Sequence, residues 1–424
     1  MNHKQITAAA AATGASLLAQ QVAGKSVRDA FFLSIFGSSE LPGMMLGSAL
    51  LSILLAFVLS KSFRRHGPTP ILSGSLLLSS IFYAIEYWLC IHTPRITAIA
   101  LYLHQSVIGA ISVSAFFLLI GETLGLRDAK RCLPRIHTGV TFGAFFGGIA
   151  AIRIVAETDF SIMFLLLATT HALVGCVTFV PFLYRKPCSS AIEVNTTRHA
   201  SNDIGSIKNR AFRDVYLRNI AMLVLVSSAA ATLLDFAMKS SADMAFEGRS
   251  EDLIRFFVVY YTLTSLLTFG VQAGLGQIAV RRLGLGSTLS IGPIALCFTG
   301  VLALPFLSLG TITLLKATES ILANSFFRSC YELLYAPLTV ERKRSVKALI
   351  DIACVRAGDL AGSSLVLLIL WWISIDPYFV PYVSVHSLTG LGSQLSIALA
   401  LGLFGAALWL SRRIYRDYVA ARFD

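Results

Sequence analysis

The sequence predicts an all-α polytopic membrane protein of about twelve transmembrane helices, arranged as two pseudo-symmetric six-helix bundles. Of its 424 residues, 55% are hydrophobic and only 14% are charged, whereas soluble globular domains carry about 25% charged residues. Apolar runs of about 20 residues, the length that a helix needs to cross the hydrocarbon core, recur along the whole chain. The mean hydropathy of +0.72 also excludes an intrinsically disordered chain.

The predicted spans follow one another with short connections: 8–36, 41–61, 70–92, 97–125, 136–157, 160–184, 216–246, 251–279, 286–308, 309–335, 348–375 and 390–412. One long hydrophilic stretch interrupts them, between the sixth and seventh spans. We therefore expect an N-terminal six-helix bundle (1–184), a cytoplasmic linker (185–215) and a C-terminal six-helix bundle with a short cytoplasmic tail (216–424).

The distribution of Lys and Arg predicts the orientation. Most of the 35 basic residues lie at the two termini, in the linker and in the loops that lead from even-numbered to odd-numbered spans. The opposite loops contain only Arg95 and Arg249. The positive-inside rule then places both termini and the linker in the cytoplasm, and a bacterial inner membrane is the expected location. The same rule explains the net charge of +12, so no nucleic-acid partner is expected.

The two halves of the chain share sequence features. The first span contains Lys25-Ser-Val-Arg-Asp29-Ala-Phe, and the seventh contains Lys239-Ser-Ser-Ala-Asp243-Met-Ala-Phe. The fourth and tenth spans end in a similar way, each followed by a basic loop and a helix with spaced glycines: Gly121-Glu122 before Gly139, Gly143 and Gly147, and Tyr331-Glu332 before Gly358 and Gly362. Two six-span repeats joined by a cytoplasmic linker are typical of the major facilitator fold. We interpret the glycine rows chiefly as sites of close helix packing.

Eight basic residues lie within the predicted spans: Lys25, Arg28, Arg153, Lys239, Arg255, Lys316, Arg328 and Arg356. A charge at the bilayer centre costs about 2.5–3.5 kcal/mol, so each is expected to face a partner or a cavity. All but Arg28 have an acid three or four residues away on the same helix face. The expected pairs are Lys25–Asp29, Arg153–Glu157, Lys239 with Asp235 and Asp243, Arg255 with Glu251 and Asp252, Lys316–Glu319, Arg328–Glu332 and Arg356–Asp359.

These basic residues are expected to be compensated in different ways. Arg153, Arg255 and Lys316 are expected to be neutralised locally. Arg28 needs either a carboxylate from another helix, for which Glu86 and Glu122 are candidates, or a substrate anion. Glu86 and Glu122 are also the candidates for a proton-coupling site. His104 and His171, which lie in spans, are interpreted as hydrogen-bonded packing residues.

The sequence at the end of the tenth span resembles that of a known family. Its sequence is Ser325-Phe-Phe-Arg-Ser-Cys-Tyr-Glu-Leu-Leu-Tyr-Ala-Pro-Leu338, and a basic loop leads to Lys347-Ala-Leu-Ile-Asp351-Ile. It is similar to S-L-F-D-P-T-K-E-M-A-Y-I-P-L and K-A-A-I-D-V of the nucleotide transporters of the ATP:ADP antiporter family, a divergent branch of the major facilitator superfamily found in plastids and intracellular bacteria. The shared residues are Glu332, Tyr335, Pro337, Leu338, Lys347 and Asp351.

The resemblance continues outside this stretch. The family's R-D-T-K-D lies over Lys25-Ser-Val-Arg28-Asp29, and Glu122 and the segment from Asp235 to Lys239 are also similar. Two residues depart from the pattern, since Tyr331 replaces a lysine and Arg328 replaces an aspartate. The resemblance covers essentially the whole chain, but it is specific only in the tenth and eleventh spans.

Together, the charges and the resemblance imply a secondary transporter that works by alternating access and exchanges nucleotides of the ATP/ADP type or a related phosphorylated anion. The expected substrate-binding residues are Lys25, Arg28, Lys239, Arg328 and Arg356. The expected charge-partner or gating residues are Asp29, Glu122, Asp235, Glu332, Lys347, Asp351 and Asp359.

Two alternatives remain open at this point. One is a proton-coupled carrier of another small solute, with Glu86 or Glu122 as the proton site. The other is a membrane scaffold or receptor without transport, because buried ion pairs can be architectural. An enzyme is not predicted, since neither H-E-x-x-H nor G-x-S-x-G occurs. No metal, cofactor or obligate protein partner is expected besides the lipid bilayer and a small anionic substrate, which could be ATP or ADP.

Overall fold

The computed structural model describes residues 3–123, 126–157, 161–184, 215–272, 275, 277–335, 350–375 and 385–423. The first half of this part contains α1 (His3–Phe36), α2 (Leu41–His66), α3 (Pro68–His92), α4 (Pro94–Thr123), α5 (Leu126–Glu157) and α6 (Ile162–Tyr184). The second half contains α8 (Val215–Phe246), α9 (Ser250–Val271), α10 (Gln277–Ala303) with the short η2 (Leu304–Phe306), the segment α11 (Leu309–Leu322)–η3 (Ala323–Phe327)–α12 (Arg328–Leu334), the segment η4 (Ile350–Cys354)–α14 (Val355–Ile375), and α15 (Val385–Phe423).

These twelve helical segments confirm the predicted fold class. Most begin and end within a few residues of the predicted spans. Four differ more: α5 begins at Leu126 instead of 136, α9 ends at Val271 instead of 279, α10 begins at Gln277 instead of 286, and α15 continues to Phe423 beyond 412. The added turns contain basic residues. The hydropathy pattern did not include them, because it ends where the apolar part of the bilayer ends, whereas a helix can continue into water. The predicted linker lies outside the described residues, except for Val215.

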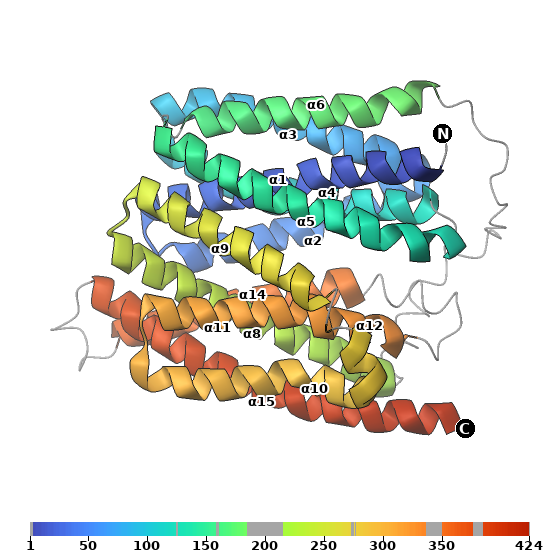
Figure 1. Ribbon diagram of the computed structural model, residues 1–424. Helices are drawn as coiled ribbons and strands as arrows, with labels where there is room; N and C mark the ends of the chain where they lie inside the picture. The colour runs from blue at the N-terminus through green and yellow to red at the C-terminus, as the bar shows by residue number, and fades with distance from the viewer. Residues whose placement is uncertain are drawn as a thin grey trace.

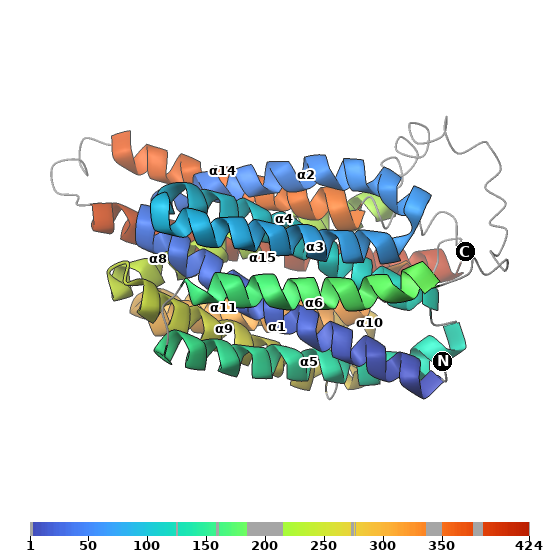
Figure 2. The same cartoon turned by 90° about the horizontal axis from the view of Figure 1, so that it is seen from above.

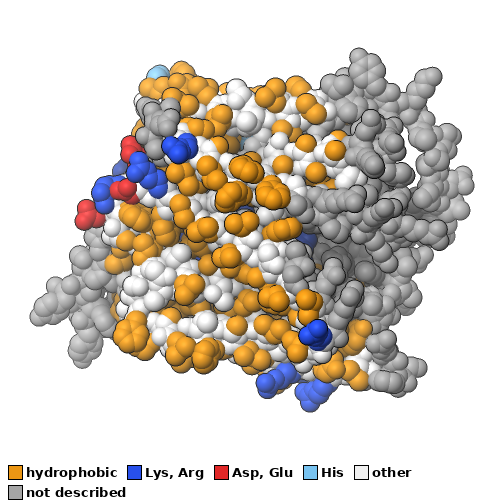
Figure 3. Space-filling view, viewed as in Figure 1, with side chains coloured by type: hydrophobic (Ala, Val, Ile, Leu, Met, Phe, Trp, Pro, Cys, Tyr) orange, Lys and Arg blue, Asp and Glu red, His pale blue; other side chains and the backbone are white. Residues whose placement is uncertain are grey.

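The surface fits a protein that spans a membrane. Seven of the described helices are long and apolar enough to cross a bilayer by themselves, and three more contain shorter apolar stretches. Figure 3 shows hydrophobic side chains spread over the middle of the molecule, with described charged side chains toward its edges. The central helix α1 is rich in alanine and polar residues. It is enclosed by α4, α5, α6 and α9, so it does not need a lipid-facing apolar surface.

The helices form two groups, α1–α6 and α8–α15, which lie side by side (Figures 1 and 2). The first helix of each group occupies the same place: α1 packs along α5, and α8 packs along α14. Glycines allow both contacts. A Cβ added at Gly139, Gly143 or Gly147 would come within 3.0 Å of Ala11, Ala15 or Ala19, and one added at Gly358 or Gly362 would come as close to α8. Close packing is therefore the role of both glycine rows.

The two groups are joined mainly at one end of the molecule. A single hydrophobic core there combines residues of both groups, such as Phe32 and Phe164 with Phe236 and Phe257. Toward the other end, the described cores are separate. One cluster around Leu72 and Phe116 belongs to the first group, and a second cluster around Leu217 and Tyr335 belongs to the second. Both chain termini lie at this second end (Figures 1 and 2).

Polar contacts also close the joined end. The chain turns after α1 at Gly37, where φ is +71°, a value that suits glycine. The backbone N–H of Ser38 then donates to Asp243 Oδ2 of α8 over 2.8 Å. This contact ties the first turn between α1 and α2 to the second group. The structure is thus held together at the end opposite the termini.

The glycine row gives a first prediction. Gly143→Ala should destabilise the protein by about 1–3 kcal/mol, because the added methyl group overpacks the contact with α1. Gly47→Ala in α2 is the matched control, since a Cβ there meets no atom within 4 Å. Thermal unfolding of the detergent-solubilised variants measures both. Equal unfolding temperatures for the two variants would contradict the proposed packing.

Candidate functional site

Asp29 of α1 is the centre of the largest described cluster of buried charges. Its side chain is fully buried, and its Oδ1 accepts from Arg28 Nε at 2.8 Å and pairs with Arg28 Nη2 at 2.7 Å. The same oxygen lies 3.2 Å from Lys239 Nζ of α8. Lys239, 2% exposed at its side chain, also pairs with Asp235 at 2.8 Å. The cluster therefore joins α1 of one group to α8 of the other through charge.

Hydroxyl and aromatic groups complete the surroundings of Asp29. Tyr261 of α9 donates its hydroxyl to Asp29 Oδ2 over 2.6 Å, so both carboxylate oxygens are engaged. Arg28 Nη1 donates to Ser106 of α4 over 3.1 Å. The Arg28 guanidinium stacks over the Tyr102 ring, 4.7 Å from its centroid. Sequence analysis missed Tyr102, Ser106 and Tyr261, since a spacing rule within one helix does not detect partners from other helices.

The cluster carries a surplus of positive charge. Lys25, Arg28 and Lys239 are three cations, whereas Asp29 and Asp235 are two acids. Lys25 lies one turn from Asp29 toward the end where the termini are, and its side chain is exposed although its neighbours Gly24 and Ser26 are buried. It forms no ion pair among the described residues. Asp235, one turn from Lys239 in the same direction, is 24% exposed at its side chain. Both groups are therefore accessible from the side on which the cores separate.

Three predicted pairings are corrected by this geometry. Lys25 does not pair with Asp29, because Arg28 and Lys239 already occupy that carboxylate. Arg28 finds its acid in its direct neighbour Asp29 instead of Glu86. Lys239 pairs with Asp235 as predicted but not with Asp243, which accepts from the backbone of Ser38.

Two other predicted pairs are confirmed. Arg356 Nη1 lies 3.1 Å from Asp359 Oδ2, and both side chains are partly exposed. Asp359 Oδ1 also accepts from Ser228 of α8 over 2.5 Å, so this pair is fixed to the helix that carries Lys239. Lys316 pairs with Glu319 at 2.6 Å and donates to the backbone carbonyl of Ala231 over 3.1 Å. This pair is buried and locally neutral, as expected.

The remaining predicted site residues are only partly described. Arg328 is exposed and begins α12, directly after the π-helical turn η3. Arg356 is the second residue after another π-helical turn, η4. Such turns are often found at functional sites, because they displace the side chains that follow. The side chains of Glu122, Glu332 and Asp351, and Lys347 altogether, lie outside the described residues, so their predicted roles stay predictions.

A second buried polar cluster lies within the first group of helices. Glu86 of α3 is 3% exposed, and its Oε1 lies 2.9 Å from His104 Nδ1 of α4. His104 Nε2 lies 2.8 Å from Ser79 Oγ. Glu86 Oε2 is buried and has no hydrogen-bond partner in the described part of the chain. His104 thus has an ionisable partner that the packing interpretation did not include.

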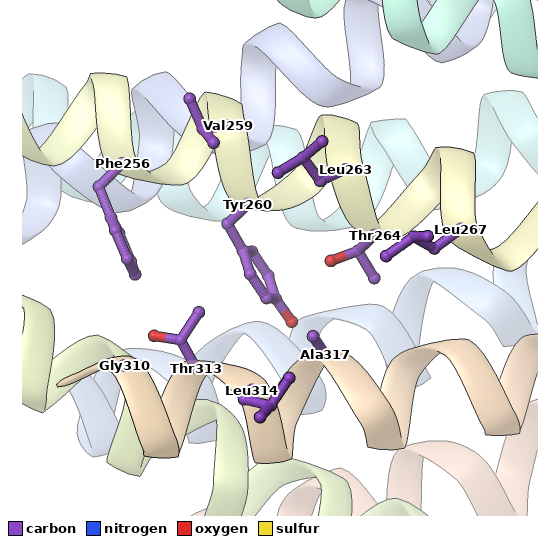
Figure 4. Close-up of a pocket in the computed structure, with 10 residues that line it drawn as sticks. All are labelled: Phe256, Val259, Tyr260, Leu263, Thr264, Leu267, Gly310, Thr313, Leu314 and Ala317. Carbon is purple, nitrogen blue, oxygen red and sulfur yellow. The ribbon is translucent and has the colours of Figure 1, made fainter. Parts of the chain in front are cut away.

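One hollow in the described surface is separate from these charges. It lies between α9 and α11, measures about 300 Å³ and is lined mostly by apolar side chains such as Leu263, Leu267 and Leu314 (Figure 4). Leu263 and Leu314 are 50% and 69% exposed, so the hollow opens toward the lipid side of the molecule. It contains none of the predicted substrate-binding cations and is not the candidate site.

Comparisons with known proteins support the fold. No protein-family model and no curated protein sequence matches the chain. Among solved structures, it is similar to the nucleoside transporter NupG, with 10% identity, a TM-score of 0.68 and coverage of 97% of this chain and 99% of that one. It is also similar to a bacterial homologue of the human lysosomal transporter Spinster in an inward-facing, unoccupied conformation, with 13% identity, a TM-score of 0.65 and coverage of 99% of this chain and 98% of that one. A D-xylose–proton symporter is similar with 13% identity, a TM-score of 0.56 and coverage of 93% of this chain and 96% of that one.

The buried cluster gives a second prediction. Asp29→Asn should destabilise the protein by about 3–5 kcal/mol, because it leaves Arg28 and Lys239 buried without their shared carboxylate. Adding Lys239→Met should recover part of this loss, since one uncompensated cation is then removed. Thermal unfolding of the purified variants measures the coupling.

The matched control is Asp252→Asn. Asp252 pairs with Arg249 at 3.2 Å, but the side chains are 35% and 65% exposed, so the loss should stay below about 1 kcal/mol. If Asp29→Asn destabilises the protein no more than this control does, Asp29 does not hold the two groups together.

Proposed function

We propose that the protein is a secondary transporter that exchanges nucleotides of the ATP/ADP type, or a related phosphorylated anion, by alternating access. The observation that carries this proposal is the Asp29 cluster, which has three cations against two acids and lies where the two groups of helices meet. A substrate with several negative charges would compensate the surplus. Arg28 suits phosphate oxygens in particular, because its planar guanidinium can donate two parallel hydrogen bonds.

The ion pairs suggest how binding would be linked to movement. In the empty protein, Asp29 acts as the internal anion for Arg28 and Lys239. A phosphate that approaches from the exposed Lys25 would compete with Asp29 for these cations. Because Lys239 and Tyr261 belong to one group of helices and Asp29 to the other, such competition weakens contacts that hold the groups together. Substrate binding would thereby favour the rearrangement that opens the joined end.

The same charges give a reason for exchange. An empty site with surplus positive charge is costly to enclose away from water, and a bound anion offsets this cost. The loaded carrier would then cross between its two states more readily than the empty one. Return of the carrier would need a second anion on the other side, which is the behaviour of an antiporter.

The similar structures agree with a transport role. NupG is named a nucleoside transporter and the Spinster homologue a transporter, and both span nearly the whole length of this chain. The Spinster homologue is described as inward-facing, and here the cores separate at the end that carries both termini. We propose that this end faces the cytoplasm and that the helices divide into the two domains predicted from the sequence, 1–184 and 216–424, joined by the linker 185–215.

A proton-coupled carrier of another small solute is the second candidate function. The observation that favours it is the buried Glu86–His104 pair, because both side chains can bind a proton. The two candidates differ in what drives uptake. Exchange needs a substrate on the opposite side, whereas proton coupling needs a pH gradient and no internal substrate.

Reconstituted vesicles test the function. Purified protein in proteoliposomes loaded with ADP, ATP, phosphate or buffer alone should take up labelled ATP only when an exchangeable anion is inside. Uptake that requires only an acidic exterior would favour the second candidate. Absence of uptake under every loading, with correctly inserted protein, would overturn the nucleotide proposal.

Lys25 gives a third prediction. Lys25→Gln should lower the exchange of labelled ADP about tenfold or more, because a hydrogen bond to a charged group contributes about 1.5–3 kcal/mol. Lys25→Arg should retain most of the activity, since it keeps the charge. Arg255→Gln is the control, because Arg255 is an exposed cation near the start of α9 and is not one of the cluster residues. Equal rates for Lys25→Gln and Arg255→Gln would remove Lys25 from the site.

A further inference from the structure

The Glu86–His104 pair is isolated from the other charges of the first group of helices. The two side chains are each 4% exposed, and no Lys or Arg forms an ion pair with Glu86 in the described part of the chain. Its neighbours on α3 are Ser79 and Tyr83, and the described residues of α2, 41–55, include no ionisable side chain. His171 of α6 faces the Tyr83 ring, and its Nδ1 lies 2.7 Å from the carbonyl of Leu167. Arg28 of α1 is compensated by Asp29.

Because the pair is isolated, its net charge depends on whether it holds a proton. With one proton shared between the carboxyl group and the imidazole, the pair has no net charge. Without that proton, a carboxylate would be buried next to a neutral imidazole and no described cation, which is costly. The unpartnered Glu86 Oε2 offers a second position for a proton on the same carboxyl group. Local geometry therefore favours a pair that binds one proton and releases it only when the surroundings change.

A polar path connects this pair to the anion site. The Tyr83 and His104 rings lie 4.6 Å apart between centroids. The Tyr83 hydroxyl donates to Gln105 Oε1 of α4, and Gln105 Nε2 lies 3.5 Å from Gln21 Oε1 of α1. Gly24 packs directly on this contact, since a Cβ there would lie 2.6 Å from Gln105 Nε2 and 3.0 Å from the Tyr83 hydroxyl oxygen. Lys25, the exposed cation of the site, is the next residue.

We propose that the Glu86–His104 pair is a proton-binding site of the carrier and that its proton moves with the more highly charged nucleotide. This coupling rests on the nucleotide exchange proposed above. A nucleoside triphosphate carries about one more negative charge than a diphosphate, so a triphosphate entering with one proton balances a diphosphate leaving alone. The proton binds to the pair from the side on which the triphosphate enters and leaves to the side on which it is released.

The first arm of the experiment detects the proton and does not depend on transport. Infrared spectra of the protein in lipid vesicles are recorded over a range of pH, and the carboxylic-acid carbonyl band is followed. The wild type should show a titrating band that is absent from Glu86→Gln and shifted in His104→Asn. Glu251→Gln, which alters an exposed acid at the start of α9, is the control and should keep the band. A band unchanged in Glu86→Gln overturns the proton site.

The second arm measures coupling by comparing two kinds of exchange in proteoliposomes. An exterior more acidic by one pH unit should raise the final accumulation of external ATP against internal ADP by up to about tenfold for one coupled proton. Exchange of ADP for ADP should not respond, because no proton moves with the diphosphate in either direction. In Glu86→Gln the response of the ATP–ADP exchange should be lost while ADP–ADP exchange persists.

The outcomes separate the two proposals. A titrating Glu86 with equal pH responses in wild type and Glu86→Gln overturns the coupling. If neither exchange occurs with any anion, the proposed function fails, and the infrared titration still decides whether the proton site exists. Thermal unfolding of each variant shows that it is folded, and His104→Asn provides the second test if Glu86→Gln is unstable.

Discussion

The carboxylate of Asp29 is the interaction on which the centre of the molecule depends. It is fully buried, and it meets Arg28 from its own helix and Lys239 and Tyr261 from the other group of helices. A buried acid is tolerated only when its charge and both oxygens are engaged, and here three side chains from three helices do so. The closeness of α1, α8 and α9 is therefore both a packing contact and an electrostatic requirement. Any rearrangement that separates the groups at this point must supply another partner for each ion.

The packing of the helices places this cluster at a boundary. On one side, a single apolar core and the Ser38–Asp243 contact close the molecule. On the other side, each group has its own core, and the side chains one turn away, Lys25 and Asp235, are accessible. The glycine rows of α5 and α14 keep each group compact by drawing it onto α1 and α8. In the proposed alternating access, the two compact groups would move relative to each other at this charged boundary.

The sequence predicted the fold well and the site only in part, for a physical reason. Length and hydropathy determine where a helix can cross a bilayer, so the number and limits of the spans could be predicted, and glycine spacing indicated close packing. Pairs on one helix face, such as Arg356–Asp359 and Lys316–Glu319, follow from helical periodicity. The pairing of Lys239 with Asp29 and of Glu86 with His104 depends on how helices are placed beside one another, which local spacing does not contain. Arg28 was misjudged because the spacing rule ignores direct neighbours, although its long side chain folds back onto Asp29.

The two buried clusters solve the problem of charge in a membrane differently. The Asp29 cluster keeps a surplus cation in an accessible position, and in the proposed transport cycle a mobile anion supplies its compensation. The Glu86–His104 pair has no described cation beside it, and in our proposal a proton held by the two side chains supplies the compensation. Both clusters meet α1 within one turn, at Gly24, Lys25 and Arg28, where the helix contacts Tyr83, Gln105 and Ser106. A change of charge in either cluster therefore alters the electrostatic cost in the other, because little water separates them and charges interact more strongly at low dielectric. Anion and proton binding are in this way expected to influence each other through a single helix, without movement between the two groups.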